Sequence, residues 1–175
     1  MTFFVSSPAL AQTQFGWTDA SSSTVDTTIG QVPADAYKAG YNGTPSVPDD
    51  TLYACRGQYK DSVQPGKLWK SWCHIGWGGK EVLLNEYEVL VTDPGKMTLS
   101  WIPSATGALK PANLVYGGYN DNSEGYGGYP LDLCRVAYKG GVHPGKLWQD
   151  MCHIGWGGKE VYLNEYEILR LDANL

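Results

Sequence analysis

Two Cys-His pairs are the residues of this chain best suited to metal chemistry, because thiolate sulfur and imidazole nitrogen are the usual ligands of zinc. The pairs are Cys73-His74 and Cys152-His153. Adjacent residues of a β-strand point to opposite faces, so one pair cannot easily chelate a single ion. We therefore expect no metal site and no bound cofactor.

The other two cysteines, Cys55 and Cys134, precede Cys73 and Cys152 by the same number of residues. An even number of symmetrically placed cysteines favours disulfides in an oxidising compartment, and four cysteines allow three pairings. If the strands expected at 51–59 and 69–77 are neighbours, Cys55 pairs with Cys73 and Cys134 pairs with Cys152.

Carboxylate pairs are the remaining candidates for chemistry. Glu86 with Glu88, and Glu165 with Glu167, are spaced to share one face of a strand. Paired carboxylates can hydrolyse glycosides. Here the same pair occurs in both halves of the chain on a face that the pattern predicts to be solvated, so we interpret it as structural. The sequence has no Ser-His-Asp order and no phosphate-binding loop, and we expect a protein that is not an enzyme.

The chain contains two copies of one unit. Pro-Gly-Lys-Leu-Trp at 65–69 recurs at 144–148, and the ten residues from Cys73 recur from Cys152. The copies span 15–92 and 99–175 and follow an N-terminal arm or the remnant of a truncated signal peptide at 1–14. They are joined by a turn at 93–96. Because this joint is too short for two independent domains, we expect the halves to pack into one unit.

Within a copy, strand and turn signals alternate, which predicts an all-β fold. We expect strands at 51–59 and 69–77, a turn at 64–67 around Pro65-Gly66, and a hairpin turn at Gly78-Gly79. One or two further strands follow within 80–91. In the second copy, His143 is expected in the turn equivalent to 64–67.

Composition limits the partners. The 175 residues carry a net charge of −5 with no run of Lys or Arg, so nucleic acids and anionic membranes are poor candidates. No apolar stretch reaches the roughly 20 residues that span a bilayer.

Ala9-Leu10-Ala11 has the form of a signal-peptidase site. We expect a secreted, extracellular or periplasmic location.

The ordered series of short motifs resembles the DM9 repeat. The motifs are Val-Pro-Ala-Asp-Ala at 32–36, Ala-Gly-Tyr-Asn at 39–42, Leu-Tyr-Ala-Cys-Arg-Gly at 52–57, Pro-Gly-Lys at 65–67, Cys-His-Ile at 73–75, and Gly-Gly-Lys-Glu at 78–81. The second copy matches from Pro111 onward. The resemblance implies a mannose-binding lectin with a β-sandwich-like unit in which two repeats intertwine about a pseudo-twofold axis. It also implies one sugar site per repeat and a homo-oligomer, often a dimer.

The resemblance also implies the sugar-binding residues. These are Asn42, Asp61 and Lys67 in the first copy, and Asn120 or Asp121 with Lys146 in the second. Gly140 stands where Asp61 would fall, so we expect Lys67 to contribute more to binding than Lys146. The candidate stacking platforms for a pyranose are Trp69, Trp77, Trp148 and Trp156.

A structural subunit is the alternative to a lectin. The N-terminal arm and the Tyr/Gly-rich segment at 116–129, expected to be a loop, could add strands between protomers and build an extracellular fibre or coat. A lectin is retained on mannose resin as a small oligomer, whereas an assembly subunit polymerises and ignores the sugar.

Overall fold

The computed structural model describes residues 15–20, 32–45, 50–93, 98–121 and 128–172, and these form fourteen β-strands. The fold is all-β, as predicted. The N-terminal arm at 1–14 and most of the turn at 93–96 lie outside the described residues. None of the described segments is a helix long and apolar enough to cross a membrane.

The strands fall into two series of seven, one per repeat. The first series is β1 (Phe15–Asp19), β2 (Lys38–Tyr41), β3 (Thr51–Tyr59), β4 (Ser62–Trp69), β5 (Trp72–Trp77), β6 (Lys80–Leu84) and β7 (Glu88–Thr92). The second series is β8 (Thr98–Ala105), β9 (Tyr116–Asn120), β10 (Tyr129–Tyr138), β11 (Gly141–Trp148), β12 (Met151–Trp156), β13 (Lys159–Leu163) and β14 (Glu165–Asp172).

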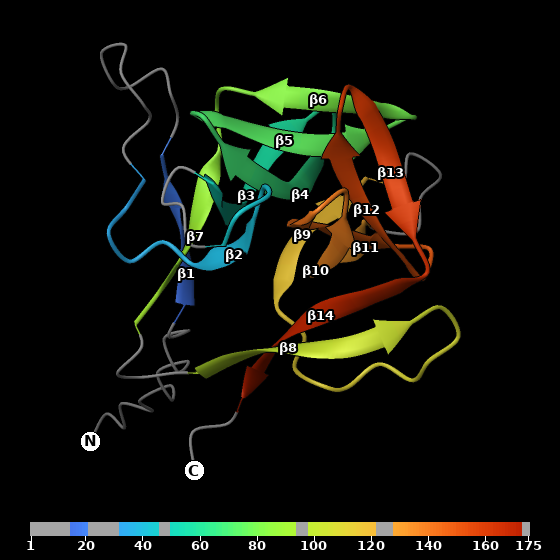
Figure 1. Ribbon diagram of the computed structural model, residues 1–175. Coiled ribbons are helices and arrows are strands. Elements are labelled where there is room, and N and C mark those ends of the chain that lie inside the picture. Colours follow the sequence, from blue (N-terminus) through green and yellow to red (C-terminus); the bar gives the residue numbers. More distant parts are fainter. Residues whose placement is uncertain (1–14, 21–31, 46–49, 94–97, 122–127, 173–175) are drawn as a thin grey trace, which may run out of the picture.

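The two repeats exchange strands and close one barrel, with the order β3-β2-β11-β10-β9-β4 and back to β3. β2 of the first repeat pairs with β11 of the second through Tyr41 and Val142. β9 of the second repeat pairs with β4 of the first through Tyr119 and Val63. Figure 1 shows these strands together, with β7 and β1 extending from one side and β14 and β8 from the other. The intertwined arrangement is therefore confirmed.

Glycine is required at both exchange points. A Cβ on Gly40 would lie 2.0 Å from the carbonyl oxygen of Val142, and one on Gly118 would lie 2.1 Å from that of Val63. Real side chains do not approach a backbone oxygen so closely. The repeats can pair across the barrel only because these positions carry no side chain.

The prediction of a turn at 64–67 is wrong, because Pro65-Gly66 lies inside β4. At this dipeptide the strand changes its neighbour from β9 to β5. A proline has no N–H to give to a ladder, so it suits a position where the ladder is interrupted. The chain reverses instead before Ser62 and at Lys70-Ser71, where both residues have positive φ, 47° and 68°.

Other strand predictions are confirmed or shifted. The strand at 51–59 and the Gly78-Gly79 hairpin turn are confirmed, with φ of 58° and 82° at the two glycines. The segment 80–91 contains two strands. The strand predicted at 69–77 begins at Trp72, since Trp69 ends β4. His143 lies in β11 and not in a turn, and 116–120 of the predicted loop forms β9.

Both disulfides join cysteines within a repeat, as predicted, with Cα–Cα distances of 5.9 Å for Cys55–Cys73 and 5.8 Å for Cys134–Cys152. The reason for their proximity differs from the one expected, because β4 lies between β3 and β5 in the sheet. Cys55 is opposite Gly66, where a Cβ would lie 2.1 Å from the carbonyl oxygen of His74. The missing side chain lets β5 approach closely enough for the disulfide.

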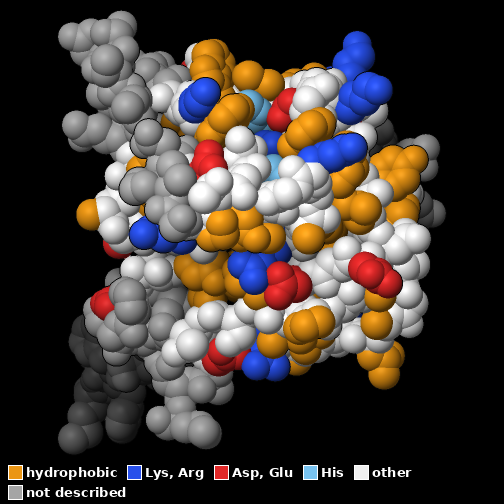
Figure 2. Space-filling view, viewed as in Figure 1, with side chains coloured by type: hydrophobic (Ala, Val, Ile, Leu, Met, Phe, Trp, Pro, Cys, Tyr) orange, Lys and Arg blue, Asp and Glu red, His pale blue; other side chains and the backbone are white. Residues whose placement is uncertain are grey.

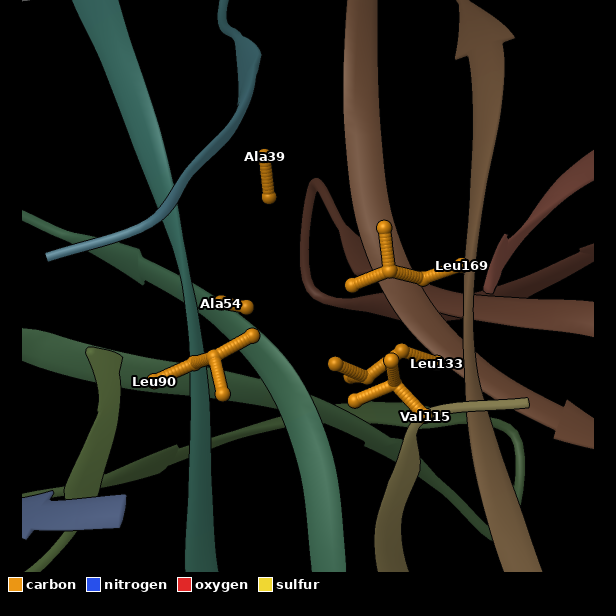
Figure 3. Packing of buried hydrophobic residues seen from close by; sticks show 6 residues of the cluster. All are labelled: Ala39, Ala54, Leu90, Val115, Leu133 and Leu169. Carbon is orange, nitrogen blue, oxygen red and sulfur yellow. The ribbon is translucent and has the colours of Figure 1, made fainter. Parts of the chain in front are cut away.

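Among the residues that the structure describes, the hydrophobic core has three parts. One cluster surrounds each disulfide and belongs to one repeat. The third is shared and takes Ala39, Ala54 and Leu90 from the first repeat and Val115, Leu133 and Leu169 from the second. Figure 3 shows these two sets facing each other between the strands. Neither repeat can bury its share of this cluster without the other.

Substitution at the exchange points tests this arrangement. We expect Gly40→Ala and Gly118→Ala each to lower the free energy of unfolding by about 3 kcal/mol, because the new methyl group collides with a backbone carbonyl. Gly16→Ala is the control, since its Cβ would lie 3.9 Å from Val91 Cγ2 in ordinary contact. Urea denaturation measures all three, and equal midpoints would show that the close approach is unimportant.

Candidate functional site

Each repeat presents a row of three side chains across adjacent strands. In the first repeat Lys67 is opposite His74, which is opposite Leu83. In the second, Lys146 is opposite His153, which is opposite Tyr162. Residues directly opposite each other project from the same face. Exposure rises along each row, from 3% at both lysines through 7% at both histidines to 47% at Leu83 and 59% at Tyr162.

A glutamate completes each row. Glu81 Oε1 lies 2.9 Å from His74 Nδ1 and 3.8 Å from Lys67 Nζ. Burial alone would raise the pKa of the Glu81 carboxyl, but the hydrogen bonds from His74 and a backbone N–H, together with the charge of Lys67, lower it below its usual value. The carboxylate is therefore held ionised beside the buried lysine.

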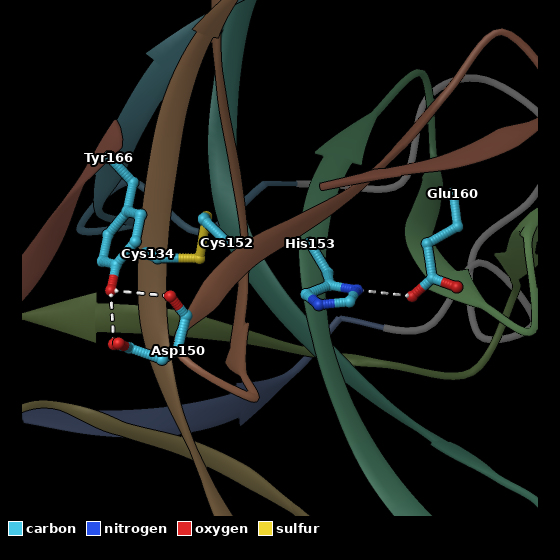
Figure 4. Close-up of a disulfide and its surroundings, with 6 residues drawn as sticks. All are labelled: Cys134, Asp150, Cys152, His153, Glu160 and Tyr166. Carbon is cyan, nitrogen blue, oxygen red and sulfur yellow. Dashed lines mark hydrogen bonds and ion pairs between the residues drawn. A yellow bond between two sulfur atoms is a disulfide. The ribbon is translucent and has the colours of Figure 1, made fainter. Parts of the chain in front are cut away.

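The second row has the same geometry. Glu160 Oε1 lies 3.0 Å from His153 Nδ1 and 3.9 Å from Lys146 Nζ. Figure 4 shows His153 reaching Glu160 while the disulfide of Cys152 lies on the other side of the strand. The expected opposite orientation of neighbouring Cys and His is thus present. Because the cysteines are oxidised in disulfides, no thiolate is available to hold a metal.

The hairpin of each repeat caps the glutamate of the other. The backbone N–H of Gly158 donates to Glu81 Oε2 at 2.8 Å, and that of Gly79 donates to Glu160 Oε2 at 2.9 Å. The Gly-Gly turns present these N–H groups across the junction of β6 and β13, whose pairing joins the repeats. Each row is consequently a composite of both repeats.

Lys146 donates hydrogen bonds to two groups of the first repeat. Its ammonium donates to Gln64 Oε1 at 2.7 Å and to the carbonyl of Gly76 at 2.8 Å, and Gln64 Nε2 donates to Asn120 Oδ1 at 2.6 Å. We call Lys146, Gln64, Asn120, Glu160 and His153 the Lys146 cluster. Burial lowers the pKa of Lys146 to about 8, although the charge of Glu160 acts in the opposite direction.

In the equivalent Lys67 cluster, His143 stands at the position of Gln64. We define this cluster as Lys67, Glu81, His74 and His143. His143 is fully buried, and its Nε2 lies 3.1 Å from the carbonyl oxygen of Tyr138, to which it donates in the neutral tautomer. Its Nδ1 has no hydrogen-bond partner within the described part of the chain. Burial, followed by the charge of Lys67, lowers the pKa of His143 to about 4.

The structure groups the predicted sugar-binding residues across repeats. Asp61 precedes Ser62, whose Oγ accepts from the backbone N–H of Asp121 at 3.0 Å, and Asn120 bonds to Gln64. Asp61, Asn120 and Asp121 therefore lie at one end of the Lys146 cluster.

Asn42 lies instead beside the Lys67 cluster. A Cβ on Gly141 would be 2.7 Å from both the carbonyl oxygen of Asn42 and the ring of His143. No described contact joins Asp61 to Lys67, so the structure does not bring the expected first-copy set together.

The four tryptophans proposed as platforms are half-buried and already occupied by aromatic or imidazole neighbours. Their ring-centroid distances are 5.6 Å for Trp77–Tyr59, 5.4 Å for Trp156–Tyr138, 5.8 Å for Trp148–Tyr129 and 5.9 Å for Trp69–His74. Tyr162 is the most exposed of the aromatic residues that the structure describes as exposed, and its ring lies 5.2 Å from His153. Its signal in the sequence is a single difference, Leu83 against Tyr162, in an otherwise repeated segment.

Other cluster residues were missed by the sequence analysis. Glu81 and Glu160 follow His74 and His153 at the same spacing across a Gly-Gly hairpin, which was a usable signal. Gln64 and His143 carried no such signal, because they were placed in a predicted turn.

Intertwined strands and paired polar clusters define a β-protein built from two repeats that share one barrel. The sequence matches the DM9 repeat over residues 46–128 and 125–174, and the chain belongs to this family, which is linked to carbohydrate binding. The matched segments begin later along the chain than the copies at 15–92 and 99–175. No curated protein matches the chain.

A solved structure shares the fold. The nematode sperm cell motility protein MFP2B superposes with a TM-score of 0.65 at 17% sequence identity. The match covers 98% of this chain and 50% of the nematode chain, so this protein spans about half the length of that relative. At this identity the likeness establishes the fold alone.

The pH dependence of stability tests the environment of His143. Its pKa is about 4 in the folded protein and 6.5 in the unfolded chain, so between these values the unfolded chain binds more protons. Stability is therefore lost as the pH falls from 6.5 to 4, by about 3 kcal/mol. His143→Gln, which copies Gln64, should remove this loss.

Urea denaturation of wild type and His143→Gln between pH 4 and 7 measures the difference, and other titrating groups cancel in the comparison. Gln64→His is the reciprocal control, and it should introduce a similar loss into the Lys146 cluster. Identical pH profiles for wild type and His143→Gln would contradict the assignment.

Proposed function

We propose that this protein binds mannose-type glycans and catalyses no reaction. The observation that carries the proposal is the exposed ring of Tyr162 at the end of the buried Lys146, His153 and Glu160 row. Together with membership of the DM9 repeat family, this arrangement supports a sugar ligand. A pyranose presents hydroxyl groups on its edge and an apolar C–H face, and the row offers partners for both.

The Tyr162 end of the row supplies the stacking surface. Tyr162 is 59% exposed, and the Glu160 carboxylate, which accepts from His153 and from the backbone N–H of Gly79, lies beside it. A pyranose over the ring would place hydroxyl groups near this carboxylate. Leu83 occupies the equivalent position in the first repeat and offers no aromatic face.

The other end of the Lys146 cluster supplies polar groups from Asp61, Asn120 and Asp121. The carboxylates of Asp61 and Asp121 are on exposed residues, and each can bridge two vicinal hydroxyl groups. Asn42 and Asp50 lie beside the Lys67 cluster, and the Asp50 carboxylate already accepts a hydrogen bond from the backbone N–H of Thr44. Gly140 stands where the second copy would have the equivalent of Asp61. We therefore infer that the Lys146 cluster is the stronger site. This reverses the order expected from the sequence, because Asp61 lies with Lys146.

Location and valency follow from the same proposal. Two disulfides are typical of proteins that function in oxidising compartments, which supports a secreted or extracellular lectin. Single sugar sites of this size bind weakly. A homo-oligomer would carry several copies of the two unequal sites of each chain. Simultaneous binding at these sites would raise the overall affinity for a glycan-coated surface.

Titration with a mannose oligosaccharide tests the function. We expect Tyr162→Ala to weaken binding about tenfold, because the stacking contact is lost, while the matched control Leu83→Ala changes it less than twofold. Asp61→Asn with Asp121→Asn should also weaken binding. Thermal unfolding of each variant verifies that the fold is intact.

Two results would contradict the proposal. Equal affinities for Tyr162→Ala and Leu83→Ala would remove Tyr162 from the site. A wild-type protein that polymerises and is not retained on mannose resin would favour the structural subunit, whose N-terminal arm lies outside the described residues.

A further inference from the structure

A second row of side chains crosses the junction between the repeats. Trp77 is opposite Lys80, Lys80 is opposite Lys159, and Lys159 is opposite Trp156, across strands β5, β6, β13 and β12. Directly opposite residues project from the same face, so these four side chains form one strip. We call it the Trp-Lys-Lys-Trp strip. Both lysines are exposed and both tryptophans are half-buried.

The two lysines of the strip lack compensating charge. Like charges directly opposite each other on neighbouring strands destabilise the pairing. No ion pair joins Lys80 or Lys159 to an acidic group among the described residues. The neighbouring carboxylates of Glu81 and Glu160 are engaged by His74, His153 and the two hairpin N–H groups. An anion between the lysines would relieve this repulsion.

Two more lysines flank the strip symmetrically. Lys60 Nζ lies 5.5 Å from the ring centroid of Trp77. Lys139 Nζ lies 5.9 Å from that of Tyr138, which in turn packs on Trp156 at 5.4 Å. Figure 2 shows Lys and Arg atoms gathered at the upper right, where β6 and β13 meet in Figure 1. Four exposed lysines thus lie around the rings of Trp77 and Trp156. The chain as a whole has a net charge of −5.

We propose that the Trp-Lys-Lys-Trp strip binds an anionic polysaccharide, with a sulfate or carboxylate group of the sugar chain between Lys80 and Lys159. An ammonium group on a flexible stem can follow either anion. The adjacent rings of Trp77 and Trp156 supply apolar surface for the pyranose units. The strip shares no residue with the proposed mannose site, although the two are neighbours, since Lys146 Nζ lies 5.1 Å from the ring centroid of Trp77.

The dimensions and charge favour a glycan over other polyanions. Three strand spacings of about 4.8 Å make the strip about 14 Å long, which is a narrow contact. Outside the strip the chain is acidic overall, so it repels a broad anionic surface such as a lipid bilayer or a DNA duplex. A single sugar chain with spaced anionic groups can engage the strip alone.

Titration with a heparin oligosaccharide and with an oligogalacturonate tests the proposal and identifies the anion, since the first carries sulfate and the second only carboxylate. We expect wild type to bind at least one of them with an affinity that falls as salt rises. Lys80→Gln with Lys159→Gln should weaken this binding at least tenfold and flatten its salt dependence. Mannose binding is measured in parallel as an independent readout and should be unchanged.

The matched control removes the same charge elsewhere. Lys38 and Lys70 are exposed and lie outside the strip, so Lys38→Gln with Lys70→Gln should change the affinity less than threefold. The variant Lys80→Glu provides a second test, because it reverses one charge of the strip. It should raise the thermal midpoint of the free protein by pairing with Lys159, and it should abolish binding.

Three outcomes would overturn the proposal. Wild type could bind neither oligosaccharide. The control could lose as much affinity as the strip variant, which would make net charge the cause. Finally, duplex DNA or phosphatidylserine vesicles could bind as tightly at the same ionic strength, which would remove the preference for a glycan.

Discussion

The pairing of β2 with β11 and of β9 with β4 is the constraint on which the rest of this structure depends. It requires Gly40 and Gly118, because any side chain there would collide with the facing backbone. The closed barrel brings Lys146 within hydrogen-bond distance of Gln64 in the other repeat. It also lets each Gly-Gly hairpin donate to the glutamate of the other repeat and brings the two halves of the shared core together. The polar clusters are therefore consequences of the exchange.

A symmetric frame makes single differences between the copies informative. Gln64 satisfies Lys146, whereas His143 leaves a ring nitrogen without a partner in the described structure. Tyr162 gives one row an exposed aromatic end where Leu83 gives the other an aliphatic one. Because the surrounding backbone is repeated, these differences translate directly into sites of unequal chemistry on one chain. The Lys80–Lys159 contact belongs to neither copy alone and exists only where they meet.

Local patterns in the sequence predicted the features that depend on local chemistry. The repeat, the all-β class and the Gly78-Gly79 hairpin all followed from spacing and composition. The pairing of Cys55 with Cys73 was predicted correctly but from neighbouring strands, whereas β4 lies between β3 and β5. The Pro65-Gly66 dipeptide misled, since a strand that changes its neighbour needs the same residues as a turn. The true reversal at Lys70-Ser71 contains neither Gly nor Pro. The grouping of Asp61 with Lys146 depends on long-range pairing, which no local pattern reports.

The most direct test of the strand exchange is complementation between fragments 1–93 and 94–175, prepared separately with their disulfides intact. Each fragment alone leaves its part of the shared core exposed and lacks two of the pairings that close the barrel. The exchange predicts that neither fragment shows cooperative unfolding or slow amide hydrogen exchange, and that an equimolar mixture regains both, with protection in β2 and β9. Cooperative unfolding of either fragment by itself would contradict an obligatory exchange.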